Sequence, residues 1–342
     1  MKILIVGCGS IGRRHMENVS SCADEVAACD LNDDNLNKAT QNKNVKGFKD
    51  LSEALAWGAN AVVVATPHIT HIDIACKAVL SGAHVMIEKP ISHVLDGVQE
   101  LLDLAKENGK VVYTVCNMRF HPAITAIREY LPQIGKVLYA RAQYGNYLPN
   151  MRADADYKKL YCAHKDQGGG VIMDVIHEID YLRWLFGDAE SVKCDAATLS
   201  DLDIDVEDYA HINLRHKNNV RCEIHMDYLK PYKRRGCEVV GDKGMLLWNS
   251  EGKNPEHCTV KHYDVAQDEW KDIYASDNLD ANAAYEALMK EFIDGISGQK
   301  ISDIISSGHD GLEALKIALA AQKSATQKGQ EILFDEVMNN HE

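Results

Sequence analysis

A glycine-rich turn directly follows an apolar strand at the start of the chain. Gly7, Gly9 and Gly12 form the pattern G-x-G-x-x-G immediately after the run Lys2 to Val6. The first glycine permits a tight turn, the second permits close approach of a phosphate, and the third lets the next helix pack on the strand. The amides at that helix N-terminus suit an anion, so the turn predicts a dinucleotide site. The residues expected to bind the cofactor here are Gly7, Gly9, Ser10, Ile11 and Gly12.

The first 115 residues alternate short, β-branched apolar runs with longer amphipathic stretches. Buried parallel strands joined by crossover helices produce this pattern. The predicted strands are Lys2 to Val6, Glu25 to Cys29, Val45 to Phe48, Ala61 to Ala65, His84 to Ile87 and Val111 to Val115. The predicted helices are Ile11 to Val19, Asn32 to Gln41, Leu51 to Ala56, Ile69 to Ser81 and Ser92 to Asn108. We therefore expect an α/β fold whose residues 1–121 form a doubly wound dinucleotide-binding domain.

The sequence pattern changes after Phe120. The elements predicted there are a helix to about Leu131, a strand from Lys136 to Tyr144, a helix opened by Gly168-Gly169-Gly170, and two final helices, Ala281 to Ile296 and Gly308 to Gln327. Between Ala189 and Asp264, runs of roughly 8 to 10 residues are separated by turn signals, which is typical of an antiparallel sheet. Residues 122–342 are therefore expected to form an α+β domain with a large, mostly antiparallel open sheet.

Composition argues against several functions. The 342 residues carry a formal net charge of −14, which repels a phosphate backbone, so no nucleic-acid partner is expected. No apolar run approaches the roughly 20 residues that cross a bilayer, and the start does not resemble a signal peptide. We therefore expect no membrane association and a cytoplasmic location. The ten cysteines are scattered without zinc-ligand spacing, which predicts reduced thiols and no metal site.

Asp30 ends the second predicted strand, 18 residues after Gly12. A carboxylate at this place accepts hydrogen bonds from the ribose hydroxyls of an adenosine. The next residues are Leu31 and Asn32, so no local arginine neutralises a 2′-phosphate. The sequence therefore favours NAD over NADP, with Asp30 binding the cofactor. The alternative interpretation is a plain glycine turn beside an acidic helix cap.

Two further strands end in residues suited to a ligand cleft. Glu88-Lys89-Pro90 follows the fifth predicted strand and Thr66-Pro67 follows the fourth, at the carboxyl edge where open α/β sheets bind ligands. There Lys89 is placed to donate a hydrogen bond to a substrate oxygen and to assist proton transfer. The other interpretation of Lys89 is an ordinary Glu–Lys pair at a strand end. The cofactor-binding residues expected at this edge are Thr66, Pro67, His71, Glu88 and Lys89.

A second polar group lies on the helix predicted after the three glycines. At about 100° per residue, one stripe of that helix is apolar and the opposite stripe carries an acid and a histidine. The apolar stripe is Ile172, Val175, Ile179, Leu182 and Phe186, and the opposite stripe is Asp174, His177 and Tyr181. A histidine beside an aspartate, facing away from the core, is a candidate general acid/base with its orienting partner. The glycines are interpreted either as a flexible turn or as a close backbone approach to a ligand.

Taken in order along the chain, these motifs resemble one known family. The phosphate turn, Glu88-Lys89-Pro90, the segment Asn117 to Pro122, and Gly168 through His177 are similar to the glucose-fructose oxidoreductase/inositol dehydrogenase/MocA family. The resemblance covers essentially the whole chain. It implies a Rossmann domain followed by an α/β domain whose open sheet often serves as an oligomer interface, and therefore a homodimer or homotetramer.

The same resemblance implies roles for single residues. Lys89 corresponds to the family's catalytic lysine, His177 to its acid/base histidine, and Asp174 to a carboxylate near both. Arg119 is implied to lie close to the cofactor and the substrate. The chain departs from the family in one respect, because the acid and the histidine are three residues apart instead of four. Alignment on His177 puts Met173 at the acid position.

The irregular segment from Tyr144 to Arg152 resembles the variable substrate-contacting segment of sugar-acting relatives, and its polar aromatics suit sugar rings. The expected substrate-binding residues are Lys89, Arg119, Tyr147, Arg152, Tyr161, Asp174 and His177. Arg152 and Lys165 are interpreted either as contacts for a carboxylate or phosphate of an acidic or nucleotide-linked sugar, or as solvated charges.

The leading hypothesis is reversible hydride transfer between a nicotinamide and a hydroxyl-bearing carbon of a sugar, sugar derivative or cyclitol. Two alternatives stay open. One is a glycosidase that uses bound NAD with no net redox change, and the other is a non-catalytic dinucleotide-sensing regulator.

Overall fold

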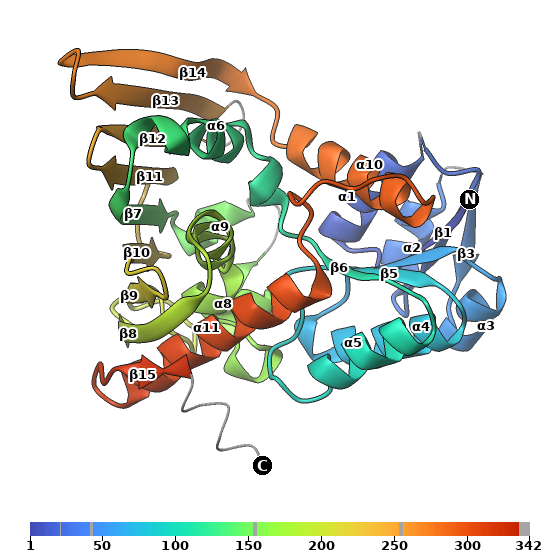
Figure 1. Ribbon diagram of the computed structural model, residues 1–342. Helices are drawn as coiled ribbons and strands as arrows, with labels where there is room; N and C mark the ends of the chain where they lie inside the picture. The colour runs from blue at the N-terminus through green and yellow to red at the C-terminus, as the bar shows by residue number, and fades with distance from the viewer. Residues whose placement is uncertain (21, 42–43, 153–155, 253–255, 335–342) are drawn as a thin grey trace. The chain divides into compact units, whose positions relative to one another are not determined.

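The computed structural model describes residues 1–20, 22–41, 44–152, 156–252 and 256–334 of the chain (Figure 1). The chain divides into two compact units. Unit 1 consists of Met1–Asn117 and Asn282–Leu315, and unit 2 consists of Met118–Ala281 and the chain from Lys316 onward. The division expected at residue 121 differs from this one, since it assigned the returning segment 282–315 to the second domain. Local hydrophobic periodicity does not show that a later segment of the chain packs back onto an earlier unit.

Unit 1 contains a six-stranded parallel sheet in the order β3-β2-β1-β4-β5-β6. Its strands are β1 (Lys2–Val6), β2 (Glu25–Cys29), β3 (Val45–Phe48), β4 (Ala61–Val64), β5 (His84–Ile87) and β6 (Val112–Thr114). Every residue of β4 and all but the first of β1 are buried, as expected for the centre of a sheet with helices on both faces. The strand order reverses between β1 and β4, where such sheets bind ligands. The prediction of a doubly wound parallel sheet is confirmed.

The helices of unit 1 are α1 (Ser10–Val19), α2 (Asp33–Ala39), α3 (Leu51–Ala56), α4 (His71–Leu80), α5 (Val98–Glu107) and α10 (Ala283–Ile296), and α10 packs beside α1 (Figure 1). The side chains of Asn32 and Asp50 accept N–H groups in the first turns of α2 and α3. One predicted start is wrong, because α5 begins at Val98 and not at Ser92. Gly97 has a φ of 77°, a left-handed conformation that no helix can continue through, so the helix starts after it.

Unit 2 contains a nine-stranded sheet in the order β14-β13-β12-β11-β7-β10-β9-β8-β15. Its strands are β7 (Val137–Gly145), β8 (Ala189–Ala197), β9 (Tyr209–His216), β10 (Arg221–Asp227), β11 (Arg234–Gly241), β12 (Gly244–Glu251), β13 (Glu256–Asp264), β14 (Glu269–Leu279) and β15 (Ile332–Leu333). Among the strands that the structure describes in this sheet, only β7 and β10 pair in parallel, which confirms the mostly antiparallel sheet. The sequence pattern did not predict β14, because this edge strand is exposed along most of its length and lacks apolar alternation.

The helices of unit 2 are α6 (Pro122–Tyr130), α7 (Leu148–Met151), α8 (Val171–Asp174), α9 (His177–Phe186) and the C-terminal part of α11 (Gly308–Thr326), which begins in unit 1. Across both units, short 3₁₀ turns occupy His68–Thr70, Asn117–Phe120, Leu131–Ile134, Tyr157–Lys159, Tyr161–Ala163 and Lys165–Gln167.

One face of the nine-stranded sheet packs on helices: α6 contacts β12 to β14, and α9 contacts β7 and β10. The alternate residues, including the exposed Tyr139, Arg141 and Arg221, form what we call the outer face.

Candidate active site

The three glycines of the phosphate turn differ in what surrounds them. A Cβ added at Gly7 would lie 2.6 Å from the backbone oxygen of Ala65, and one added at Gly12 would lie 1.8 Å from the oxygen of Gly7. Gly7 also has a φ of 92°, which side chains rarely adopt. A Cβ added at Gly9 would meet nothing within 4 Å. Two glycines therefore shape the turn, and Gly9 leaves open space at the N-terminus of α1.

Asp30 lies directly beside this turn. Its carboxylate accepts a hydrogen bond from the N–H of Cys8 at 2.7 Å and another from the N–H of Asn32 at 2.7 Å. Arg13 donates to the backbone oxygen of Cys8 at 2.9 Å and so braces the turn from within. A carboxylate oriented by backbone amides, next to the open space at Gly9, fits the adenosine ribose and pyrophosphate of a bound dinucleotide.

The loops after β4 and β5 are joined by His71, a fully buried residue at the start of α4. Its Nε2 lies 2.9 Å from the oxygen of Thr66, and its Nδ1 lies 3.1 Å from the oxygen of Pro90. Burial lowers the pKa of His71 because it penalises the imidazolium. Both ring nitrogens face protein carbonyls, and the predicted role of His71 in binding the cofactor stays a prediction.

Glu88 is held by a histidine that the sequence analysis did not single out. One carboxylate oxygen lies 2.6 Å from Nε2 of His15, and the other accepts the N–H of Lys89 at 3.1 Å. His15 is completely buried on α1 among apolar residues such as Met16 and Val19. The available signal was a polar ring on the buried face of an otherwise amphipathic helix.

In unit 2, Asp174 accepts hydrogen bonds from two tyrosines. The hydroxyl of Tyr161 bonds one carboxylate oxygen, and that of Tyr228 lies 3.3 Å from the other. Burial first, and the negative charge of Asp174 second, raise the pKa of both tyrosines well above 10. Both hydroxyls therefore stay protonated and donate. The Tyr161 hydroxyl donates to Asp174, and its predicted contact with substrate stays a prediction. Nothing in the local sequence marked Tyr228.

The helix predicted after the glycines is broken. Asp174 ends α8 and His177 begins α9, with two residues between them outside both helices. The expectation of an exposed stripe opposite the core is wrong in part, since Tyr181 is fully buried with its ring 6.3 Å from that of Trp248, and His177 is buried as well. Because the helix breaks, residues after Asp174 do not continue the stripes that one regular helix would have, and α9 is buried on more than one side.

The glycines before α8 pack against the chain itself. A Cβ at Gly169 would lie 2.4 Å from the oxygen of Tyr161, and one at Gly170 would lie 2.4 Å from the carboxylate of Glu207. Gly169 is thus closely approached by backbone and Gly170 by a carboxylate of the same chain, and the close approach to a ligand stays a prediction.

Arg119 is buried in unit 2 and bound to Asp180. Its Nε and Nη2 donate to the two carboxylate oxygens at 2.9 and 2.6 Å, and both side chains are 1% exposed. The guanidinium also lies 5.6 Å from the ring of Trp184. A neighbouring pair joins Arg235 to Glu178 at 2.7 Å. The guanidinium is thus engaged by protein, and its predicted contact with cofactor or substrate stays a prediction.

The predicted substrate segment lies at the end of β7. Tyr147 is half-buried just before α7, and Arg152 is exposed just after it. The N–H of Leu148 donates to the oxygen of Tyr228 at 2.9 Å, so the segment is tied to the strand end that also supports Asp174. The positive charge of Arg152 acts against the rise in the pKa of Tyr161. Lys165 is exposed, and its backbone N–H donates to Asp205.

The predicted residues thus form two groups, each described within its own unit. Unit 1 brings the glycine turn together with Asp30, and Thr66 together with the loop that carries Lys89. Unit 2 brings Asp174 together with Tyr161, with His177 at the head of the next helix. Among the residues with described structure, no cluster of histidine, cysteine, aspartate or glutamate suits a metal ion, and no helix is long and apolar enough to cross a membrane.

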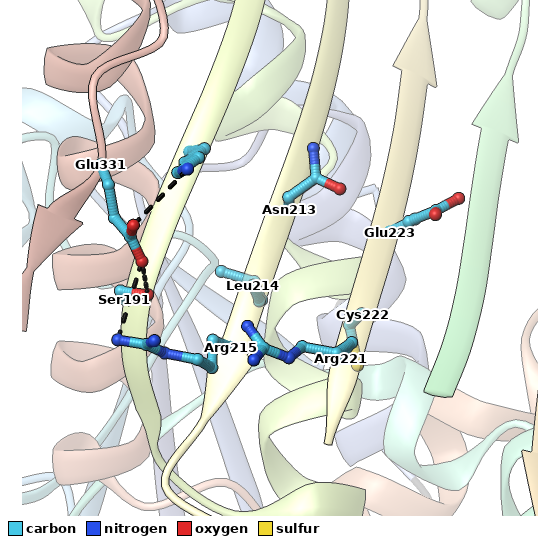
Figure 2. Close-up of a pocket in the computed structure, with 9 residues that line it drawn as sticks. Ser191, Asn213, Leu214, Arg215, Arg221, Cys222, Glu223 and Glu331 are labelled. Carbon is cyan, nitrogen blue, oxygen red and sulfur yellow. Dashed lines mark hydrogen bonds and ion pairs between the residues drawn. The ribbon is translucent and has the colours of Figure 1, made fainter. Parts of the chain in front are cut away.

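A separate hollow lies on the outer face of unit 2 (Figure 2). It is lined by Ser191, Lys193, Asn213, Leu214, Arg215, Arg221, Cys222, Glu223 and Glu331. Glu331 accepts a hydrogen bond from Ser191 at 2.5 Å and lies 3.5 Å from Lys193. None of the predicted site residues lines this hollow.

Comparison with known proteins agrees with these two halves. Residues 1–115 match the family described as "Oxidoreductase family, NAD-binding Rossmann fold", and residues 130–247 match the "GFO/IDH/MocA C-terminal domain". The chain is 31% identical over 251 residues to an uncharacterised oxidoreductase of Synechocystis, covering 67% of this chain and 66% of that protein. It is 27% identical over 351 residues to the myo-inositol 2-dehydrogenase of Thermotoga maritima, covering 99% of this chain and 100% of that protein.

A solved structure agrees with this similarity. An Agrobacterium radiobacter oxidoreductase, solved with NAD+, L-tartaric acid and magnesium, shares the fold with a TM-score of 0.85 at 19% identity, over 98% of this chain and 99% of that one. The chain therefore belongs to the GFO/IDH/MocA family of NAD-binding oxidoreductases.

Proposed function

We propose that this protein is an NAD-dependent oxidoreductase that transfers hydride between the nicotinamide and a hydroxyl-bearing carbon of a sugar, sugar derivative or cyclitol. The observation that carries the proposal is the Asp30 carboxylate, which the amides of Cys8 and Asn32 hold beside the open space at Gly9. A ligand with ribose hydroxyls and a phosphate next to them uses both features at once.

In the proposed mechanism the side chains handle the substrate oxygen and its proton. Lys89 donates a hydrogen bond to the hydroxyl oxygen, and His177 accepts the hydroxyl proton as the carbonyl forms. Bound NAD supplies the hydride acceptor. Asp174, kept as an acceptor by the hydroxyls of Tyr161 and Tyr228, provides the negative charge that favours the protonated imidazole of His177.

Residue identities also support the proposed cofactor preference. Asp30 is followed by Leu31 and Asn32, neither of which offers a positive charge to a 2′-phosphate. Since Asp30 is held in place by two backbone amides, its negative charge stays where such a phosphate would approach. NAD is therefore the proposed cofactor in preference to NADP.

The substrate class rests on similarity and on the half-buried aromatics of unit 2. The Thermotoga relative is a myo-inositol 2-dehydrogenase, and its match extends over 99% of this chain. Tyr147 has the polar aromatic character that suits a polyol ring, and Arg152 adds a positive charge for an acidic substituent. We therefore include cyclitols, free sugars and acidic sugars in the proposed class.

We also propose a homodimer or homotetramer in the cytoplasm. The outer face of unit 2 exposes Tyr139 and Trp270 on a broad sheet, which suits burial against a second copy. All ten cysteines are free thiols in the structure, as expected in a reducing compartment.

Substitution of Lys89 by alanine tests the catalytic assignment. Loss of the ammonium donor is expected to lower kcat by about 10²-fold or more, while NADH affinity stays within threefold. Turnover is measured as NADH formation with NAD and a panel that begins with myo-inositol. Lys106→Ala, which removes an exposed lysine of α5, is the matched control and is expected to leave turnover unchanged.

Three results would contradict the proposal. Retained turnover in Lys89→Ala removes this residue from the mechanism. Sugar release without accumulation of NADH supports the glycosidase alternative. Binding of NADH without hydride exchange across the whole panel supports the sensor.

A further inference from the structure

We propose that two fully buried histidines, His15 and His71, are positioning residues that together hold the backbone on both sides of Lys89. This inference rests on the proposed role of Lys89 in the reaction. His15 acts through Glu88, the residue before the lysine, and His71 acts through Pro90, the residue after it.

The first arm runs from α1 to the end of β5. Nε2 of His15 lies 2.6 Å from one oxygen of Glu88, and the other oxygen of Glu88 accepts the N–H of Lys89. Among the residues that the structure describes, Nδ1 of His15 has no hydrogen-bond partner, so the proton belongs on Nε2. Within the described part of the chain, the hydrogen bond of this buried ring is thus to the carboxylate that also accepts the N–H of Lys89.

The ring of His15 is itself held in place by the returning helix α10. The ring of Tyr285 meets it edge-on at 5.8 Å, and the guanidinium of Arg14 covers the same tyrosine at 5.0 Å. Asn18, one turn along α1, hydrogen-bonds Asn282 at the start of α10. The segment 282–315 therefore supports the face of α1 from which His15 reaches Glu88.

The second arm runs from α4 to the same loop. Nδ1 of His71 lies 3.1 Å from the oxygen of Pro90, and Nε2 lies 2.9 Å from the oxygen of Thr66. The ring therefore lies between the loop after β4 and the loop after β5, and in its neutral form it donates its single N–H to one of these two oxygens. Because the two arms arise from different βα connections, the Lys89 backbone is held from two independent directions.

This arrangement has a functional consequence beyond packing. Lys89 must present its ammonium to a substrate oxygen, and misplacement of a catalytic group by about 1 Å can cost on the order of 10²-fold in rate. The α1 helix that carries His15 also presents the phosphate-binding turn, so the cofactor site and the lysine share one support. A substitution of His15 or His71 removes a side-chain contact to the loop of Lys89 and leaves the backbone of the phosphate-binding turn in place, so it is expected to affect turnover more than cofactor binding.

Two substitutions of His71 separate its contacts. Asparagine places an amide donor near the Nδ1 position and keeps the Pro90 contact, whereas glutamine places it near Nε2 and keeps the Thr66 contact. We expect the kcat of His71→Gln to lie at least tenfold below that of His71→Asn, with the NADH affinities of the two variants within threefold of each other. Equal kcat values for the two variants would overturn the second arm.

Two substitutions of His15 do the same for the first arm. His15→Gln keeps a donor for Glu88 and is expected to retain kcat within threefold, whereas His15→Leu removes the donor and is expected to lose at least tenfold. His216→Leu removes another fully buried imidazole, bonded to the oxygen of Gly187, and is the control for a purely structural loss. It is expected to lower the melting temperature while kcat per folded molecule is unchanged.

A second measurement needs neither substrate nor turnover. The rate at which trinitrobenzenesulfonate modifies Lys89, read by peptide mass spectrometry against Lys106 in the same protein, reports the placement of the amine. We expect at least a threefold change in His15→Leu and His71→Gln and none in the two rescue variants. An unchanged labelling rate in all four variants would refute the positioning role, whatever the substrate.

The outcomes for the two proposals are distinguishable. If Lys89→Ala abolishes turnover and His15→Leu has the wild-type kcat and labelling rate, only the positioning inference is wrong. If Lys89→Ala retains turnover, the proposed catalytic role is wrong, and the labelling experiment alone decides whether the histidines hold the loop.

Discussion

Replacing Arg119 with methionine removes a guanidinium from a place that water barely reaches. The substitution keeps most of the aliphatic stem but leaves the carboxylate of Asp180, 1% exposed, without its bidentate partner. The matched variant Asp180→Leu leaves the guanidinium uncompensated in the same way. Combining the two replaces the whole ion pair by apolar side chains of similar size.

The expected magnitudes follow from this burial. Breaking a buried pair from one side costs about 3–5 kcal/mol, whereas replacing both partners by apolar groups is close to neutral. We therefore expect either single variant to lose about 3–5 kcal/mol of unfolding free energy, and the double variant to lie within about 1 kcal/mol of the wild type. At a urea m-value near 3 kcal/mol/M, the single variants shift the midpoint by roughly 1–2 M.

Urea unfolding followed by tryptophan fluorescence measures this effect in the relevant unit. Three of the four tryptophans, Trp184, Trp248 and Trp270, belong to unit 2, so the signal reports chiefly on the unit that holds the pair. A parallel NADH titration tests the alternative that Arg119 serves the ligand. Small losses of stability in both single variants, together with a large loss of NADH affinity, would refute the structural assignment.

Two other outcomes are expected. Gly9→Ala should leave the melting temperature unchanged, because the added Cβ meets nothing within 4 Å. The same variant should bind NADH at least tenfold more weakly in a fluorescence titration. Gly12→Ala should instead lower the stability of unit 1, because its Cβ would lie 1.8 Å from the oxygen of Gly7. Equal effects of both substitutions on stability would contradict the assigned roles. Above pH 10 the protein should lose stability, because burial raises the pKa of Tyr144 to about 12 and raises those of Tyr161, Tyr181 and Tyr228 well above 10. In that range the folded state binds more protons than the unfolded one, so each tyrosine removes about 1.4 kcal/mol per pH unit until its folded pKa is reached. Tyrosinate absorbance that rises fully near pH 10, with unchanged unfolding free energy, would contradict this.

In the first half of the chain, local sequence patterns predicted most of the structure. Its six strands were predicted nearly to the residue, because buried parallel strands consist of continuous apolar runs. Asp30 was placed correctly at the end of its strand, and the structure brings it to the glycine turn through the amide of Cys8. In contrast, the start of α5 depended on the left-handed Gly97, which apolar periodicity does not report.

In the second half of the chain, several features could not be predicted from local sequence. The helix carrying Asp174 and His177 was expected to have one buried stripe, but it breaks between these residues and α9 is covered on several sides. Arg119 was expected to face a ligand, and its guanidinium pairs with Asp180, 61 residues away. The edge strand β14 was not expected at all, because neither of its faces is consistently buried.

By itself the sequence determined the dinucleotide fold, the glycine turn with Asp30, and the candidate residues Lys89, His177 and Asp174, because each depends on residue type and short-range spacing. The tertiary structure alone decided which polar groups pair. His15 with Glu88, His71 with two carbonyl oxygens, and Tyr228 with Asp174 join residues from separate elements. Such pairings are fixed by how buried elements pack, because a buried polar group must find its partner wherever the fold places one, and sequence spacing does not encode that position.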